Sequence, residues 1–183
     1  MPKMRNVCID PGHGMSNKRT GVYDPGACAF GKKEAEIAMD WTNELRAILQ
    51  ARGHKVIRTR ISSSDHTPVT ERAGIAEKYG CDIMLSLHCN AANGAANGTE
   101  TFYRGKLNAP MAEKINAAIC KALGTKSRGI KTEEQSQHAR LAVMAFQPCF
   151  LIELGFIDNA ADLAAMTDPV RRMAACEVIA ELL

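Results

Sequence analysis

Apolar residues recur along the chain with two different periods that alternate. Short apolar runs, which are typical of buried strands, occur at 5–10, 55–59, 82–88, 99–103, 141–145 and 149–154. Stretches in which apolar residues return every three or four positions predict helices at 33–52, 69–79, 108–123 and 169–183. Strands that alternate with helices predict an α/β fold, in which an open sheet is covered by helices on both faces.

The pattern contains no internal repeat, no low-complexity tract and no linker. A chain of 183 residues is long enough for one domain with a proper core, so we expect a single domain over 1–183. Apolar residues make up 46% and charged residues 23%, which is typical of a soluble globular protein. Asp168 is a suitable N-cap for the last helix, because Pro169 follows it. The irregular loop at 12–31 is rich in Gly, Asn, Ser and Pro, and loops of this length tend to carry function.

Charge and cysteine content narrow the class of protein further. The net charge is only +3 and no long run of Lys or Arg occurs, so nothing indicates a nucleic-acid partner. No apolar stretch is long enough for a signal peptide or a transmembrane helix, so we expect synthesis in the cytoplasm and no membrane insertion. The seven cysteines form no Cys-x-x-Cys pair, and their odd number favours small buried thiols over a disulfide framework.

Chemically reactive residues follow three of the predicted strands. The first strand leads into His13, the strand at 82–88 ends on His88, and the last strand carries Glu153. Because ligands bind beyond the carboxyl ends of the strands in open α/β sheets, we expect these side chains to converge. Two imidazoles and a carboxylate suit zinc, and a catalytic zinc site needs three protein ligands, an open position and a base. The site therefore needs a second carboxylate, and Glu34 and Glu36 are the other candidates.

Each of these residues also has a simpler interpretation. A lone histidine after a strand is more often a hydrogen-bonded structural residue than a metal ligand. A glutamate at the end of a buried strand is less ordinary, because a buried carboxylate needs a partner. The coincidence of three such residues at three strand ends favours a shared site. The remaining histidines, which form no cluster in the sequence, are expected to be surface or structural residues: His54, His66 and His138.

The motifs around these residues resemble a known family, the zinc-dependent N-acetylmuramoyl-L-alanine amidases of the type 3 class. The resemblance rests on the segments 9–14 (IDPGHG), 86–90 (SLHCN) and 152–159 (IELGFIDN), together with Glu34 after the long loop. Weaker matches lie between them at 52–56, 59–60, 71–73, 98–102 and 128–131. Each motif alone is unspecific, but their order along nearly the whole chain is specific.

The resemblance implies a mixed, mostly parallel sheet of about six strands and hydrolysis of the amide bond between N-acetylmuramic acid and L-alanine in peptidoglycan. It implies that His13, Glu34 and His88 hold one Zn²⁺ and that Glu153 is the catalytic base. Glu34 is preferred over Glu36 because the family's ligand stands just before the apolar helix pattern. The partners implied are the glycan strand and the stem peptide, and we expect a monomer. Candidates for lining the cleft are Asn90, Arg72 and Arg128, although a structural salt bridge is the favoured interpretation of Arg72.

Some positions depart from the family's usual pattern. Cys89 stands beside His88, but adjacent residues of a strand point to opposite faces, so we expect its thiol to face away from the metal. Cys149 is expected to serve only packing. The chain has no room for a long inserted helix that would plug the site, so an open cleft is expected.

Other functions compete with this interpretation. One is a different zinc hydrolase on a similar sheet, such as a carboxypeptidase or a deacetylase. Another is a wall-binding module without activity, although the presence of both histidines and both glutamates argues against it. The biological role expected is that of an endolysin or autolysin released onto the cell wall during phage lysis or mother-cell lysis.

Overall fold

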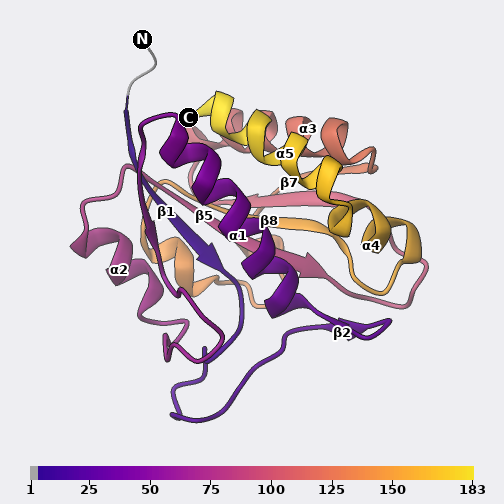
Figure 1. The fold of residues 1–183 in the computed structure, drawn as a ribbon, viewed down its shortest axis with the longest axis horizontal. Coiled ribbons are helices and arrows are strands. Elements are labelled where there is room, and N and C mark those ends of the chain that lie inside the picture. The colour runs from indigo at the N-terminus through magenta and orange to yellow at the C-terminus, as the bar shows by residue number, and fades with distance from the viewer. Residues whose placement is uncertain (1–3) are drawn as a thin grey trace.

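A computed structural model describes residues 4–183, which form a six-stranded sheet with helices on both of its faces (Figure 1). The six strands of the sheet are β1 (Asn6–Pro11), β4 (Lys55–Arg58), β5 (Ile83–Asn90), β6 (Thr99–Tyr103), β7 (Ser127–Thr132) and β8 (Cys149–Phe156). Their order is β4-β1-β5-β8-β6-β7. All neighbours are parallel except β6 and β8, which are antiparallel. The α/β fold with a mixed, mostly parallel six-stranded sheet is therefore confirmed. A separate hairpin pairs β2 (Cys28–Ala29) with β3 (Lys32–Lys33).

The helices divide between the two faces of the sheet. One face packs against α1 (Glu34–Ala51), α3 (Ala109–Leu123) and α5 (Pro169–Leu182), with α4 (Ala160–Thr167) beside them. The other face carries α2 (Arg72–Lys78) and the short 3₁₀ helix η3 (Ala142–Ala145), over a smaller core. Two further 3₁₀ turns are η1 (Lys106–Asn108) and η2 (Glu133–Gln135). Within residues 4–183, none of the helices is both long and apolar enough to cross a membrane.

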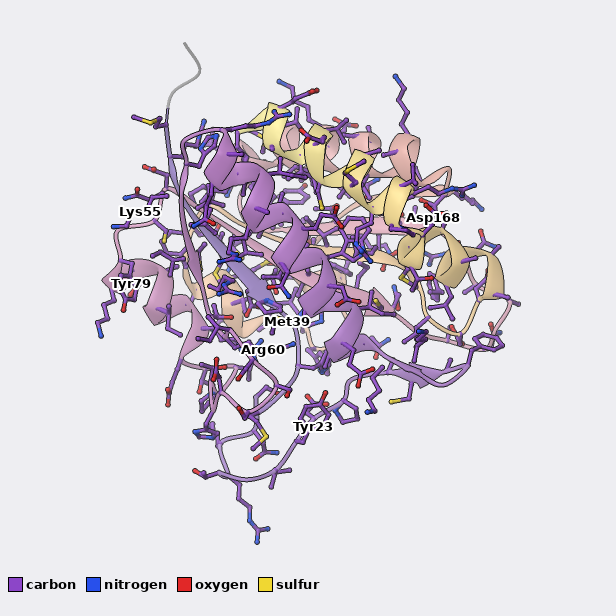
Figure 2. All side chains as sticks on the ribbon, in the orientation of Figure 1. Tyr23, Met39, Lys55, Arg60, Tyr79 and Asp168 are labelled. Atoms are coloured by element: carbon purple, nitrogen blue, oxygen red, sulfur yellow. The ribbon has the colours of Figure 1, made fainter. Side chains whose placement is uncertain are left out.

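The elements differ from the predicted ones at three places. The apolar run 141–145 is the 3₁₀ helix η3 and not a strand, because a short apolar run does not distinguish a strand from a buried turn. The sixth strand is instead β7, whose sequence SRGIKT has no fully buried residue, so it lacks an apolar run. The helix α4 was not predicted either. The expected N-cap at Asp168 is confirmed, since its side chain accepts hydrogen bonds from the amides of Val170 and Arg171 (Figure 2).

Alternation along the two central strands sorts their side chains between the faces. On β5, Leu85 and Leu87 pack into the core beneath α1, α3 and α5, so His88 points to the opposite face. On β8, Leu154 belongs to the same core, so Glu153 points to the opposite face as well. His88 and Glu153 are direct neighbours in the parallel register of β5 and β8. The sheet thus places both side chains next to each other on the face that carries the smaller core.

A buried ion pair fixes the loop that leaves β1. The Arg72 guanidinium lies 3.0 Å from Asp10 Oδ1 and also donates to the carbonyl oxygens of Pro11 and His13. Burial alone would raise the pKa of Asp10, but Arg72 and the hydroxyl groups of Ser86 and Thr59 hold that pKa below its usual value. The ion pair therefore shapes the backbone on which His13 stands.

A second arginine supports the same loop. Arg60 donates from its guanidinium to the carbonyl oxygens of Pro11, Gly12 and Ala35, and so ties the end of β1 to the start of α1 (Figure 2). Burial and the nearby Arg72 together lower the pKa of Arg60 to about 10, although Asp10 acts to raise it. Two buried guanidinium groups thus donate hydrogen bonds to the carbonyl oxygens of residues 11–13, where β1 ends.

Removal of the Arg72 side chain is expected to destabilise the fold strongly. Arg72→Ala leaves Asp10 as an uncompensated buried carboxylate, and breaking such a pair costs about 3–5 kcal/mol of unfolding free energy. Urea denaturation near pH 7 measures this loss. Lys78→Ala, at an exposed position of the same helix, is the control and is expected to change the unfolding free energy by less than about 0.5 kcal/mol. A loss of less than about 1 kcal/mol for Arg72→Ala would contradict a structural role of the pair.

Candidate active site

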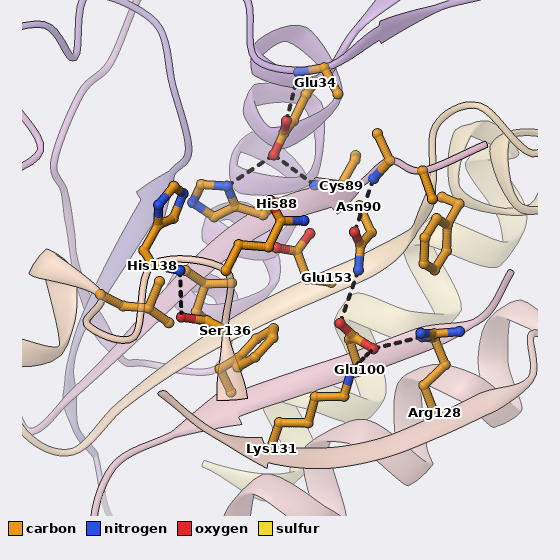
Figure 3. Close-up of a pocket in the computed structure, with 18 of the residues that line it drawn as sticks. Glu34, His88, Cys89, Asn90, Glu100, Arg128, Lys131, Ser136, His138 and Glu153 are labelled. Atoms are coloured by element: carbon orange, nitrogen blue, oxygen red, sulfur yellow. Dashed lines mark hydrogen bonds and ion pairs between the residues drawn. The ribbon is translucent and has the colours of Figure 1, made fainter. Parts of the chain in front are cut away.

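Three potential metal ligands meet at the carboxyl end of the sheet. His13 follows β1, Glu34 is the first residue of α1, and His88 lies near the end of β5 (Figure 3). One ligand atom from each lies within 4.8 Å of the others. Glu34 Oε1 is 2.9 Å from both His13 Nε2 and His88 Nδ1, and the two imidazole rings meet edge to face with centroids 5.0 Å apart.

Glu34 is held in place by backbone amides. Its Oε2 accepts a hydrogen bond from the amide of Ala27, and its Oε1 accepts one from the amide of Cys89, both at 2.9 Å. The position at the amino end of α1 also favours a negative charge. Burial alone would raise the pKa of Glu34, but the two histidines hold it well below its usual range. Glu36, in contrast, is exposed and pairs with Lys33, whereas Glu34 lies in the cluster.

His13 is oriented by a carboxylate that the sequence did not single out. Its Nδ1 lies 2.8 Å from Asp24 Oδ2, so its Nε2 is directed to the cluster. Metal-binding histidines commonly have such a carboxylate on the second ring nitrogen. Burial lowers the pKa of His13, but Glu34 and Asp24 outweigh this effect and raise the pKa to about 9. His13 also has a φ of 60°, a left-handed conformation that is uncommon for a non-glycine residue.

Two glycines allow the backbone to approach the ligands closely. A Cβ atom on Gly12 would lie 2.4 Å from Cε1 of His88. A Cβ atom on Gly26 would lie 2.6 Å from Oε2 of Glu34 and 2.7 Å from Cδ2 of His13. Because real Cβ atoms do not come this close to other atoms, both positions require glycine for the observed placement of the ligands.

Glu153 lies beside this cluster on β8. The residue is half-buried, and its Oε2 is buried and has no hydrogen-bond partner within the described part of the chain (Figure 3). Burial raises the pKa of Glu153 to about 7. Glu34 and Glu100 also raise the pKa, whereas His88 and His13 lower it. A carboxylate whose pKa lies near neutrality suits a group that both accepts and donates a proton.

The donor set fits a catalytic zinc ion. Two imidazoles and one carboxylate are the ligands of a three-residue catalytic zinc site, whereas structural sites use four protein ligands. The cluster opens into a cavity of about 510 Å³, which leaves room for water and substrate. Glu153 lines the same cavity. His13, Glu34 and His88 are therefore suited to hold Zn²⁺ and to leave a coordination position open for water or substrate.

Comparison with known proteins agrees with this geometry. The profile of one family, described as N-acetylmuramoyl-L-alanine amidase, matches residues 7–183. The chain belongs to the N-acetylmuramoyl-L-alanine amidase family. The matched region includes the three ligand candidates and Glu153.

Individual relatives of this amidase-family chain include bacterial and phage proteins. The N-acetylmuramoyl-L-alanine amidase LytC of Bacillus subtilis (strain 168) is 31% identical over 94% of this chain. The endolysin of Bacillus phage SPP1 is 29% identical over 87% of this chain. The chain spans only 34% of the length of the first relative and 58% of the second. A solved structure also resembles this chain: the catalytic domain of CwlV, an N-acetylmuramoyl-L-alanine amidase from Bacillus (Paenibacillus) polymyxa var. colistinus. The two are 25% identical and superpose with a TM-score of 0.83, and the match covers 98% of this chain and 96% of the CwlV chain.

Of the three residues predicted to line the cleft, two line it and one does not. Asn90 and Arg128 line the cavity. Arg72 does not line it, because its side chain is fully buried against Asp10, which corrects the prediction that it contacts substrate. The salt-bridge interpretation describes Arg72 instead.

The two unusual cysteines are accounted for by packing. Sγ of Cys89 lies 3.5 Å from Sδ of Met166 in the core beneath α1, so its thiol faces away from the ligands, as predicted. Burial raises the pKa of this thiol well above its usual value, which disfavours a thiolate. Cys149 is fully buried in the smaller core, which confirms the packing interpretation.

The sequence pattern did not predict several of the residues that line the cavity. Glu100 and Lys131 line the cavity, together with the segment 135–138 that follows η2. His138 was expected to be a surface or structural residue, but it lines the cavity while remaining exposed (Figure 3). Nothing in the spacing of these residues indicates that they share a wall, because β7 lacks an apolar pattern and the following segment has no period.

Proposed function

We propose that this chain is a zinc-dependent hydrolase that cleaves the amide bond between N-acetylmuramic acid and L-alanine in peptidoglycan. The observation that carries the proposal is the cluster of His13, Glu34 and His88 beside Glu153, whose Oε2 is buried and has no partner within residues 4–183. Membership of the amidase family supports the choice of bond. We further propose that residues 1–183 act as one catalytic domain, and that the protein acts as a monomer.

The mechanism assigns a separate role to each residue. His13, Glu34 and His88 would hold the metal. When bound, Zn²⁺ supplies a Lewis acid that polarises the carbonyl group of the scissile amide and makes water more acidic. Glu153 accepts a proton from the water molecule whose oxygen attacks the lactyl carbonyl carbon. Glu153 then donates this proton to the nitrogen of L-alanine as the carbon–nitrogen bond breaks.

The proposed biological role follows the relatives. They include an N-acetylmuramoyl-L-alanine amidase and a phage endolysin, so we propose that the chain acts on the wall as an endolysin or an autolysin. A sporulation-specific N-acetylmuramoyl-L-alanine amidase of Bacillus subtilis, 30% identical over 87% of this chain, gives the mother-cell role the same support. In each role the peptidoglycan glycan and stem peptide are the partners.

Mass spectrometry of the products from purified peptidoglycan tests the proposal. We expect muropeptides to separate into glycan with a free lactyl carboxyl group and peptide with a free L-alanine amino group. A chelator should stop the reaction, and added Zn²⁺ should restore it. Release of a terminal amino acid would instead indicate a carboxypeptidase, and release of acetate would indicate a deacetylase. Binding to the wall with no new amino groups would indicate a wall-binding module.

A further inference from the structure

The cavity wall opposite the metal ligands carries a buried carboxylate with two cations. Glu100 lies on β6, is only 3% exposed, and is the direct antiparallel neighbour of Glu153 on β8. Its Oε2 accepts hydrogen bonds from Nε of Arg128 at 2.6 Å and from Nζ of Lys131 at 2.7 Å (Figure 3). Its Oε1 accepts one from Nδ2 of Asn90 at 2.9 Å.

The charges of this group do not cancel. One carboxylate faces two permanent cations, so the group keeps one positive charge. Among the cavity-lining residues that the structure describes, Arg128 and Lys131 are the only lysine or arginine side chains. The permanent positive charges of the cavity therefore lie on the wall that β6 and β7 form.

The two cations still have donors to offer. Arg128 uses Nε for Glu100, and its one other hydrogen bond within residues 4–183 is a long contact of 3.4 Å from Nη1 to the carbonyl oxygen of Asn97. Lys131 uses one of its three N–H groups on Glu100. The side chains are 32% and 28% exposed, so the unused donors are accessible from the cavity. A carboxylate can accept from both at once.

Aromatic rings hold both cations in position. The guanidinium carbon of Arg128 lies 4.9 Å from the centroid of the Phe156 ring, and Nζ of Lys131 lies 5.8 Å from the centroid of the Phe102 ring. Together with Glu100, these contacts fix long side chains that would otherwise be mobile. A ligand that binds them therefore loses less free energy to side-chain ordering.

The position of the cations fits a peptide that runs from the metal site across the strands of the sheet. Glu100 is two strands away from His88, because β8 lies between β5 and β6, and neighbouring strands are about 4.8 Å apart. The Glu100 carboxylate, with the Arg128 and Lys131 nitrogen atoms bound to it, thus lies about 10 Å from His88. An extended peptide spans about 3.4 Å per residue, so about 10 Å corresponds to two or three residues.

We propose that Arg128 and Lys131, with Glu100 as their buried counter-ion, form a subsite for a carboxylate of the stem peptide. The inference rests on the proposed function. The subsite takes an acidic group on the second or third residue beyond the lactyl group. The enzyme therefore favours stem peptides in which this group is a free carboxylate over peptides in which it is a neutral carboxamide.

The test uses muramoyl-peptides that differ only in this group. One substrate carries free carboxylates at the second and third residues, and two others carry a carboxamide at one of these positions. For the unmodified protein we expect kcat/KM to fall by about tenfold when the recognised carboxylate is amidated, and the effect to shrink as salt is added. The substrate that shows the loss identifies the residue. Equal kcat/KM for all three substrates would overturn the proposal.

Single substitutions distinguish a loss of carboxylate recognition from a general loss of activity. Arg128→Gln and Lys131→Gln each leave one cation on Glu100, and each should remove the preference by lowering kcat/KM only for the carboxylate substrate. Lys114→Gln removes the same charge from an exposed position of α3 and should leave the preference intact. An equal loss on acid and amide substrates in both cavity variants would also overturn the subsite.

A binding measurement makes the result independent of catalysis. Calorimetry with metal-free protein compares the free stem tripeptide in its acid and amide forms. Tighter binding of the acid form, lost in Arg128→Gln, supports the subsite even where no hydrolysis occurs. Hydrolysis without any preference for the acid form refutes the subsite alone, whereas absence of hydrolysis with every substrate refutes the proposed function.

Discussion

Replacement of Glu153 by glutamine is expected to reduce peptidoglycan hydrolysis by about 10³-fold or more, while zinc stays bound. Proton transfer by a positioned group contributes about 10²–10⁴-fold to the rate of such reactions. A glutamine fills the same space as Glu153 but cannot accept a proton from water. The neighbouring carboxylates cannot replace it, because Glu34 is engaged by two histidines and Glu100 by two cations.

The pH dependence of stability to urea is a second measurement on Glu153→Gln. It distinguishes loss of the base from damage to the fold. In the metal-free protein the pKa of Glu153 is raised from its ordinary value to about 7, chiefly by burial. A carboxyl group whose pKa is higher in the folded state destabilises the fold increasingly as the pH rises from its unfolded pKa of about 4.5 to about 7. Glu153→Gln removes this penalty. At pH 8 the metal-free variant should therefore be at least as stable to urea as the parent, and at pH 4 the two should be alike.

The matched control for this prediction is an exposed glutamate. Glu113→Gln on α3 makes the same chemical change outside the cavity and should leave turnover unchanged. Zinc content, measured for all three proteins by atomic emission, should be one per chain. Normal turnover by a zinc-loaded Glu153→Gln protein would exclude Glu153 as the base.

The sequence could predict those site residues that stand at the ends of apolar strands. His13, His88 and Glu153 follow this rule, because parallel strands bring their carboxyl ends to one edge of the sheet. The buried runs of β1, β5 and β8 are strong signals, since these strands are covered on both faces.

Other residues could not be predicted because their positions depend on irregular backbone. Glu34 and Asp24 reach the cluster through the loop at 12–31 and the β2–β3 hairpin, whose path leaves no period in the sequence. The local pattern therefore did not distinguish Glu34 from Glu36, and only the resemblance did. Lys131 was missed for a different reason: β7 is an edge strand without buried residues, so neither the strand nor the wall it forms has an apolar signature.

Glu34 and Glu36 provide a direct test of the ligand set, because the two residues are only two positions apart on the same helix. Glu34→Gln is expected to lower the zinc content far below one per chain and to reduce hydrolysis by about 10³-fold or more. A neutral carboxamide is a weaker ligand than a carboxylate, and without the metal the reaction loses both its Lewis acid and its acidified water. Glu36→Gln removes only an exposed pair with Lys33 and should keep zinc and activity.

Thermal unfolding with and without zinc shows whether the loss lies in metal binding itself. A metal that binds only the folded state stabilises it by about 2.7 kcal/mol when its free concentration is 100 times its Kd. We therefore expect added zinc to raise the Tm of the parent and of Glu36→Gln, and to leave the Tm of Glu34→Gln nearly unchanged. If zinc raises the Tm of Glu34→Gln as much as that of the parent, Glu34 is not a ligand. In that case its two amide hydrogen bonds, from Ala27 and Cys89, would define a purely structural role at the start of α1.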